Sequence, residues 1–408
     1  MFIPRLAAPT ITSLLSGYPL VAVTGPRQSG KTTLVRALLP DRPYVSLESL
    51  DQLEFATRDP RGFLAQFPDG AVLDEVQRCP ALFSYLQTLV DEDGRMGLFV
   101  LTGSQQFELI SKITQSLAGR VALVRLLPFA LPELQAANRA PERLEDLLFS
   151  GLYPPIYDRG LDPLIWYGNY VSGYLERDVR QLINVRDLSA FQRFLRMCAA
   201  RTGQLLNLTS LATDCGITHN TARAWLSVLE ASYVVHLLQP HHRNFAKRLI
   251  KSPKLYFLDP GLAAWLIGIQ DPRQLAIHPQ RGELFETWVV AELLKARFNA
   301  ALASNLYFWR DRAGLEVDVL MDQGPKLVPV EVKSGQTLVG DFFAGLERWQ
   351  SLAGQASGRP WLVYGGTQRQ SRKLAEVVPW TAIDELAAEL LGARGGSDPP
   401  ARSSGKDA

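Results

Sequence analysis

Cysteine is scarce in this sequence, with three residues, Cys79, Cys198 and Cys215, among 408. They are far apart and form neither a metal-ligand spacing nor a disulfide framework, which is typical of a reducing compartment. No apolar run approaches the roughly 18 residues of a membrane helix. Residues 1–5 do not follow the plan of a signal peptide, and no internal repeat is visible. We therefore expect a cytoplasmic protein with no membrane partner.

An excess of charge is also lacking, because 43 basic and 41 acidic residues give a net charge of +2. The chain as a whole has no field that attracts nucleic acid, so any basic surface must be local. With 47% hydrophobic and 21% charged residues, the composition is that of an ordinary globular protein. The length favours two to four domains. Residues 391–408 are rich in Gly, Ser and Pro, which predicts a disordered tail.

The most informative segment is glycine-rich: residues 25–32 read GPRQSGKT and match the phosphate-binding pattern G-x-x-x-x-G-K-[ST] in full. An apolar run that suits a buried strand precedes it, and a run that suits a helix follows. Backbone N–H groups of such a loop face a phosphate chain, and the helix N-terminus adds positive potential. We expect Lys31 to reach the β- and γ-phosphates of ATP and the Thr32 hydroxyl to bind Mg²⁺. The predicted ATP-binding residues are Gly25, Pro26, Arg27, Gln28, Ser29, Gly30, Lys31, Thr32 and Thr33.

Hydrolysis also needs an acid for the metal and a base for water, and residues 71–75, AVLDE, provide both after a short apolar run. Asp74 is expected to hold Mg²⁺ through its water shell, and Glu75 to orient and deprotonate the attacking water. A further apolar run, GLFVLTGS, ends in Ser104. The carboxyl ends of parallel strands line the nucleotide crevice. Ser104, or Thr102 as second choice, is therefore a candidate to hydrogen-bond the γ-phosphate or the water, although a plain strand-to-loop turn is the alternative.

Arg120 follows a helix-like stretch and precedes an apolar run at 121–124. Two interpretations remain open. The arginine can project from the domain edge and complete a neighbouring subunit's active site, or it can be a surface residue favoured by the helix dipole.

In their order, the motifs GPRQSGKT, VLDEVQ, LTGSQQF, SLAGR and LPF resemble those of prokaryotic AAA+ ATPases. More narrowly, they resemble the group that carries a winged helix and a C-terminal domain of unknown function. The resemblance covers roughly residues 1–385 and continues through KLYFLDPGL, GELFETWVVAEL and VPVEVKSG. It implies the ATPase roles given above. It makes Ser104 the sensor residue and Arg120 an arginine finger, and it predicts a homo-oligomer.

A helix-turn-helix is expected in the middle of the chain, after a helical stretch with Pro and Gly breaks that would form a lid. Apolar positions at helical spacing predict one helix, a turn at Gly216 and a second helix capped by Thr218. The apolar run 233–238 would form the wing. Outward side chains of the second helix and of the next segment suit bases and phosphates. The predicted DNA contacts are Asn220, Thr221, Arg223, Arg243 and Lys247.

No acidic residue occurs between positions 236 and 254, where a basic cluster joined by His241 and ending at Lys254 is expected to contact phosphates. A solvated basic wing, or a winged helix that binds protein, is the alternative interpretation.

The C-terminal third contains a helical acid followed by a D…E-x-K pattern. Glu286 lies on an expected helix at 282–298. Asp318 lies on one expected strand, and Glu331 and Lys333 share a face of the next because side chains alternate along a strand. A hairpin that brings Asp318 near Glu331 and Lys333 would make a carboxylate cage for Mg²⁺ with a lysine beside it. The pattern resembles the PD-(D/E)xK nuclease superfamily, which implies a site of these four residues and leaves open whether it cleaves.

These observations predict an α/β protein that uses ATP and Mg²⁺, binds DNA and assembles as a homo-oligomer. One function is an AAA+ ATPase coupled to DNA binding or remodelling. The other is an ATP-gated regulatory or protein-binding module whose nuclease-like domain does not cleave. The expected domains are 1–132 (P-loop AAA+ with a parallel sheet), 133–187 (helical lid), 188–253 (winged helix), 254–390 (α/β restriction-endonuclease-like) and 391–408 (tail).

Overall fold

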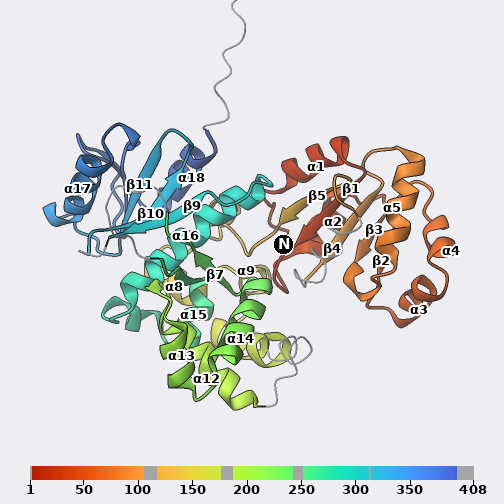
Figure 1. The fold of residues 1–408 in the computed structure, drawn as a ribbon, viewed down its shortest axis with the longest axis horizontal. Helices are drawn as coiled ribbons and strands as arrows, with labels where there is room; N and C mark the ends of the chain where they lie inside the picture. Colours follow the sequence, from red (N-terminus) through yellow and green to blue (C-terminus); the bar gives the residue numbers. More distant parts are fainter. Residues whose placement is uncertain (1, 105–116, 176–186, 242–250, 312–313, 393–408) are drawn as a thin grey trace, which may run out of the picture.

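The fold is seen in Figure 1, a computed structural model that describes residues 2–104, 117–175, 187–241, 251–311 and 314–392. Two sheets lie at opposite ends of the view, one in red and orange and the other in blue. A mainly helical part, in green, lies between and below them. None of the helices in these ranges has the length and apolar character of a membrane span.

A parallel sheet in the order β2-β3-β4-β1-β5 forms the first module. Its central strand β1 (Leu20–Thr24) is buried throughout and pairs with β4 (Phe99–Gly103) and β5 (Val121–Arg125). Helices cover both faces, so continuous apolar strands are favoured and each face has its own core. The other elements are α1 (Ala8–Gly17), α2 (Lys31–Leu38), β2 (Tyr44–Ser46), α3 (Leu50–Arg58), α4 (Pro60–Ala65), β3 (Ala71–Asp74), η1 (Val76–Arg78) and α5 (Leu82–Asp93).

The second module starts with short helices that begin near prolines and ends in a small antiparallel sheet, in the order β6-β8-β7. Its later elements follow one another as α12, β6, α13, α14, β7, β8 and α15. The bounds are α7 (Leu131–Ala136), α8 (Leu144–Ser150), α9 (Pro154–Asp158), α10 (Pro163–Tyr170), η2 (Val171–Leu175), α12 (Leu188–Ala199), β6 (Gln204–Leu205), α13 (Leu208–Cys215), α14 (His219–Ala231), β7 (Val235–Leu238), β8 (Lys254–Phe257), α15 (Pro260–Leu266) and η3 (Pro272–Ala276). Because β8 lies in the centre of this sheet, it belongs with the preceding segment and not with the strands that follow.

A mixed sheet in the order β13-β14-β12-β11-β10-β9 forms the third module. The strands β9, β10 and β11 are antiparallel neighbours, whereas β12 and β14 continue the sheet in parallel with β11. The bounds are α16 (Arg281–Asn299), β9 (Leu306–Arg310), β10 (Glu316–Asp322), β11 (Leu327–Lys333), η4 (Gly340–Phe343), α17 (Ala344–Ala353), η5 (Gly354–Ala356), β12 (Trp361–Tyr364), β13 (Gln370–Ser371), β14 (Glu376–Pro379), η6 (Trp380–Ala382) and α18 (Ile383–Gly392).

Helix α16 connects the three modules. It packs against β5 of the first, β8 and α15 of the second, and β11 and α18 of the third. Apolar side chains on all sides of this helix are therefore buried, including Leu284, Trp288, Val289 and Leu293. One apolar core runs from the second module into the third. The two modules are thus held together by burial of apolar surface, which is the main favourable contribution to folding.

Candidate functional site

The phosphate-binding loop joins β1 to α2 at the carboxyl edge of the first sheet. At Gly25 the loop passes too close to the residue that follows the neighbouring strand β5 for a side chain to fit. A Cβ at Gly25 would lie 2.0 Å from the Leu126 carbonyl oxygen. Gly30 has φ +90°, and Gln28 holds a positive φ of 59° without being glycine. Such strain in a non-glycine residue is characteristic of functional loops.

Lys31 lies inside this loop and is buried. Its ammonium Nζ donates to the carbonyl oxygens of Gly25, at 3.1 Å, and Pro26, at 2.8 Å. Burial lowers the pKa of Lys31 to about 8, although the carboxylates of Glu75 and Asp74 act in the opposite direction. The hydroxyl of Ser29 is buried beside it and has no hydrogen-bond partner in the described structure. A buried cation and an unsatisfied hydroxyl in one loop suit an anionic ligand such as a phosphate chain.

Asp74 ends β3 next to the loop and is surrounded by hydroxyl groups. The Thr32 hydroxyl donates to both of its carboxylate oxygens, at 3.1 and 3.2 Å, and the Tyr44 hydroxyl donates at 2.6 Å. Thr102, at the end of β4, also donates to this carboxylate. Thr32 and Asp74 therefore offer hard oxygen ligands at one point, which is the donor set that Mg²⁺ prefers.

Glu75 follows immediately and has a left-handed backbone, with φ +54°. The hydroxyl of Ser104 donates to its carboxylate at 3.0 Å, and the Gln77 side-chain amide donates as well. The backbone N–H of Glu75 donates to the Thr102 hydroxyl at 3.4 Å. The structure thus brings Ser104 and Thr102 to the two acids, at the carboxyl ends of β3 and β4.

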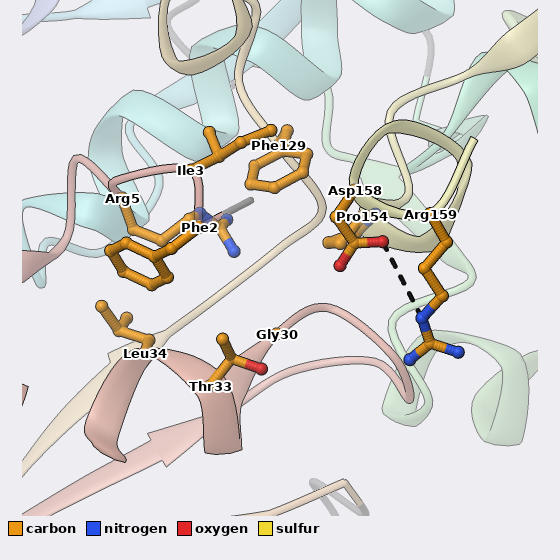
Figure 2. A pocket seen from close by; sticks show the side chains of 10 residues that line it. All are labelled: Phe2, Ile3, Arg5, Gly30, Thr33, Leu34, Phe129, Pro154, Asp158 and Arg159. Atoms are coloured by element: carbon orange, nitrogen blue, oxygen red, sulfur yellow. Dashed lines mark ion pairs between the residues drawn. The ribbon is translucent and has the colours of Figure 1, made fainter. Parts of the chain in front are cut away.

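A pocket of about 350 Å³ lies beside the loop and was not predicted. Figure 2 shows Phe2 and Arg5 on one side, Pro154 and Asp158 on the other, and Thr33 below them. Aromatic and apolar walls next to a phosphate loop suit a planar base. No spacing in the sequence connects these residues, because they come from the N-terminus, α2 and α9.

Arg5 fixes the N-terminal segment at this pocket. Its guanidinium donates to the carbonyl oxygens of Ser29, at 2.7 Å, and Leu127, at 2.6 Å, and forms an ion pair with Glu133 at 3.0 Å. The guanidinium also lies over the Phe129 ring, 4.9 Å from its centre. This residue therefore ties the phosphate loop to the start of the second module, a role that its sequence context does not indicate.

Two aromatic residues of the second module also reach the loop. The Trp166 indole N–H donates to the Gln28 side chain at 3.1 Å, and the Tyr233 hydroxyl lies 2.8 Å from the Thr24 hydroxyl. Both contacts attach distant parts of the chain to the phosphate site.

Arg120 lies far from the phosphate loop of its own chain. Its carbonyl oxygen accepts from Leu20 N–H at the amino end of β1, whereas the loop follows the carboxyl end. The side chain forms a two-pronged ion pair with Asp91 on α5, at 2.5 and 2.7 Å. Among the described residues, this side chain bonds to Asp91 and to the Ala118 carbonyl and not to the phosphate loop.

The predicted DNA-contact residues that the structure describes lie on α14. Thr218 caps this helix by accepting from Thr221 N–H at 3.1 Å, as the sequence predicts. Asn220 and Arg223 are exposed, and Thr221 is half-buried. Arg243 and Lys247 lie outside the described residues.

The acidic residues of the third module meet across α16 and the β10–β11 hairpin. Asp318 accepts from Val332 N–H at 2.8 Å, and Lys333 forms an ion pair with Glu331 at 2.6 Å. Burial raises the pKa of Glu331, and the nearby Asp318 carboxylate adds to this rise. Burial likewise raises the pKa of Glu286. The four residues that sequence reasoning singled out are therefore neighbours.

Two expectations for the basic cluster are wrong. Lys254 is buried, with its ammonium 2.9 Å from Glu286 Oε1, so it cannot contact a phosphate at the surface. His241 is also buried, and its Nε2 lies 3.1 Å from Asp322. Their neighbours in sequence are basic, but Lys254, at the start of β8, and His241, after β7, both contact carboxylates of the third module.

Comparison with known families assigns each module a match. Residues 17–135 match the AAA domain, residues 141–273 match the Domain of unknown function (DUF8612), and residues 281–383 match the Domain of unknown function (DUF4143). The AAA match supports binding and hydrolysis of ATP by this chain.

Two relatives are similar in sequence to most of this chain: Uncharacterized protein Rv2008c of Mycobacterium tuberculosis and Uncharacterized protein Mb2031c of Mycobacterium bovis. Each is 34% identical over 337 residues, which is 82% of this chain and 74% of the relative. Among solved structures, the Walker-type ATPase PABY2304 of Pyrococcus abyssi is similar with a TM-score of 0.45 and 17% identity, over 65% of this chain and 96% of that one. The RuvB Holliday junction branch migration motor of Thermotoga maritima has a TM-score of 0.30 and 17% identity, over 58% and 90%.

Proposed function

Because the chain belongs to the same family as these two mycobacterial relatives and matches the AAA domain at residues 17–135, we propose that it hydrolyses ATP with Mg²⁺ and couples the cycle to its other modules. The observation that carries the proposal is the contact of the Thr32 hydroxyl with the Asp74 carboxylate, next to a Glu75 that Ser104 holds in place. These residues come from the helix α2 that follows β1 and from the carboxyl ends of β3 and β4, where parallel sheets bind nucleotides.

Each residue has a defined task in this proposal. Lys31 neutralises the phosphates, Thr32 and Asp74 hold the magnesium ion, and bound Mg²⁺ offsets the charge that develops on the phosphates. Glu75 takes the proton of the attacking water. Ser104 orients the Glu75 carboxylate through the hydrogen bond that its hydroxyl donates. The pocket beside Phe2 accepts the base.

Steady-state release of phosphate tests this function. Glu75→Gln should lower turnover by at least about 100-fold, because general-base catalysis contributes that much, and should leave nucleotide binding intact. Lys31→Ala should lose binding as well. The matched control is Glu54→Gln, which changes an exposed carboxylate on α3. Turnover like that of the wild type in both site variants would contradict the proposal.

A DNA-binding role for the second module is supported by its order of elements. Three helices and three antiparallel strands, α12-β6-α13-α14-β7-β8, follow the plan of a winged helix, and α14 exposes Asn220 and Arg223. Retention of a DNA duplex should fall steeply with salt and weaken in Arg223→Glu. Arg58→Glu, the same charge change on α3, should leave retention unchanged. Retention that ignores salt would instead indicate a protein partner.

A second candidate function is an ATP-gated regulatory module whose nuclease-like domain does not cleave. The observation that favours it is the lysine among the acids of the third module. Incubation of plasmid, linear and branched DNA with Mg²⁺ or Mn²⁺ separates the two candidates. Cleavage that Asp318→Ala together with Glu331→Ala abolishes would exclude the second.

Assembly is the last part of the proposal. Arg120 lies at the amino ends of the strands, whereas the phosphate loop lies at their carboxyl ends, and the Arg120 side chain is one-third exposed. That position supports a role as an arginine finger toward the nucleotide of a neighbouring subunit, in a homo-oligomer.

A further inference from the structure

Lys254 joins the acid cluster of the third module from outside that module. It opens β8, and its ammonium lies 2.9 Å from Glu286 Oε1 and also contacts the Glu316 carboxylate. The side chain is 4% exposed. Burial alone would lower the pKa of Lys254, but the carboxylates of Glu286, Asp318 and Glu316 outweigh it and hold the pKa above its usual value. A positive charge therefore lies among the acids.

Neighbouring groups enclose this ammonium. The Tyr256 hydroxyl, two residues along β8, donates to the same oxygen of Glu286. The rings of Phe308 and Tyr256 lie 5.7 and 6.0 Å from the Lys254 nitrogen. Aromatic faces attract cations, so the surroundings favour an ammonium at this point.

The strand that carries Lys254 is firmly attached. β8 pairs with both β6 and β7. The chain beyond β7 then pairs with β9 of the third module: Phe308 N–H donates to the Gln239 carbonyl at 3.1 Å, and His241 N–H donates to the Phe308 carbonyl at 2.8 Å. The lysine therefore comes from a paired strand and not from a loose loop.

The charges around the site are nearly balanced. Arg310 pairs with Glu316 at 3.0 Å, and Lys333 pairs with Glu331 at 2.6 Å. Mg²⁺ requires near-octahedral oxygen ligation at about 2.1 Å, and a lysine within hydrogen-bond distance of the same oxygens repels it. Within the described residues, no group of three or more acidic, histidine or cysteine side chains has the arrangement of a metal site.

We propose that the Lys254 ammonium takes the position of the divalent cation in the C-terminal acid cluster. The cluster is then an internal ion network that fastens the second module to the third, and it does not bind a metal while Lys254 is in place. One acceptor is left over: Glu331 Oε2 is buried and has no partner among the described residues. Removal of Lys254 leaves the carboxylates of Glu286, Asp318 and Glu331 without this cation, so that they must draw closer together around a divalent cation that takes its place.

Titration of the full chain with Mn²⁺, without nucleotide and followed by electron paramagnetic resonance, tests this. The wild type and Asp318→Asn should bind the same number of ions, because the cluster takes none. Lys254→Met should bind one more, and Lys254→Met with Asp318→Asn should lose it again. Lys326→Met, which removes an exposed lysine of the same hairpin, should behave as the wild type.

Loss of one bound Mn²⁺ in Asp318→Asn alone would overturn the proposal, and that comparison needs no change at Lys254. If Lys254→Met is unstable, its melting temperature should still rise with Mn²⁺ while that of Lys254→Met with Asp318→Asn does not; no difference between them would also overturn it. Phosphate release by Glu75 is measured separately, so this inference and the ATPase proposal can fail independently.

Discussion

At the scale of single residues, the buried Lys31 makes nucleotide binding depend on pH. Burial lowers its pKa to about 8 in the nucleotide-free chain. Phosphates stabilise the charged form, so binding raises this pKa. Below pH 8 the lysine is already charged, whereas above it each binding event must take up a proton. Affinity for ATP should therefore fall as the pH rises through about 8, by up to ~10-fold per pH unit.

Calorimetry of ATP binding to Glu75→Gln at pH 7 and pH 9, in buffers of different ionisation enthalpy, measures both the affinity and the proton uptake. Lys31→Arg is the matched control, because arginine stays charged at both values. Its affinity should be independent of pH. Equal affinities and no proton uptake in the chain with Lys31 would show that the lysine is charged throughout.

Whether a residue of the phosphate site could be predicted from the sequence depends on how far along the chain its partners lie. The phosphate loop, Asp74 and Glu75 could be predicted because each belongs to a contiguous motif. Trp166 and Tyr233 could not, since their partners lie 138 and 209 positions away. Lys254 was misplaced for the same reason: the basic residues near it in sequence are local, but its carboxylate partners lie on α16 and β10.

At the scale of elements, a buried ion pair holds α16 against the segment that leads from the first module into the second. Lys295 Nζ donates to Glu292 at 2.7 Å and to the Phe129 carbonyl at 2.8 Å, and Glu292 accepts from Leu131 N–H at 2.9 Å. Both side chains are at most 2% exposed. Lys295→Met leaves a buried carboxylate uncompensated, so it should lower the free energy of unfolding by ~3–5 kcal/mol.

The double variant Glu292→Leu with Lys295→Met removes both charges and should cost less than the sum of the single changes. Urea unfolding measures all three free energies. Arg58→Ala serves as the exposed control, since its pair with Glu54 is open to solvent and should contribute less than ~1 kcal/mol. A cost for Lys295→Met as small as that of the control would show that the pair does not hold the helix.

The sequence predicts where a helix or strand begins and ends better than it predicts which other elements that helix or strand contacts. The helix expected at 282–298 is observed at Arg281–Asn299, and the strand that ends in Asp74 is found as expected. Which modules the helix touches could not be read from the sequence, because a helix that is apolar on all sides fits many partners. The pairing of β8 with β6 and β7 could not be predicted either, because these strands lie far apart in the sequence and local spacing does not show which strands pair.

At the scale of the whole molecule, Arg120 lies at the amino ends of the strands of the first sheet, whereas the phosphate loop lies at their carboxyl ends. Leu20, next to Arg120, and Thr24, next to the loop, are separated by the length of β1, about 13 Å at 3.3 Å per residue. A ring or dimer can bring the arginine of one chain to the loop of the next, whereas one chain alone cannot.

Mixing two inactive variants tests this arrangement. Lys31→Ala has no working loop but keeps Arg120, and Arg120→Ala has the reverse defect. In an equal mixture, a random assembly with shared sites pairs an intact loop with an intact arginine at about a quarter of its sites. Phosphate release should therefore recover to about that fraction of the wild-type rate and should rise with protein concentration. Asp91→Ala frees Arg120 from its ion pair without removing it, so this control should stay active. A mixture as inactive as its components, or an Asp91→Ala variant as inactive as Arg120→Ala, would mean that the arginine serves only the structure of its own chain.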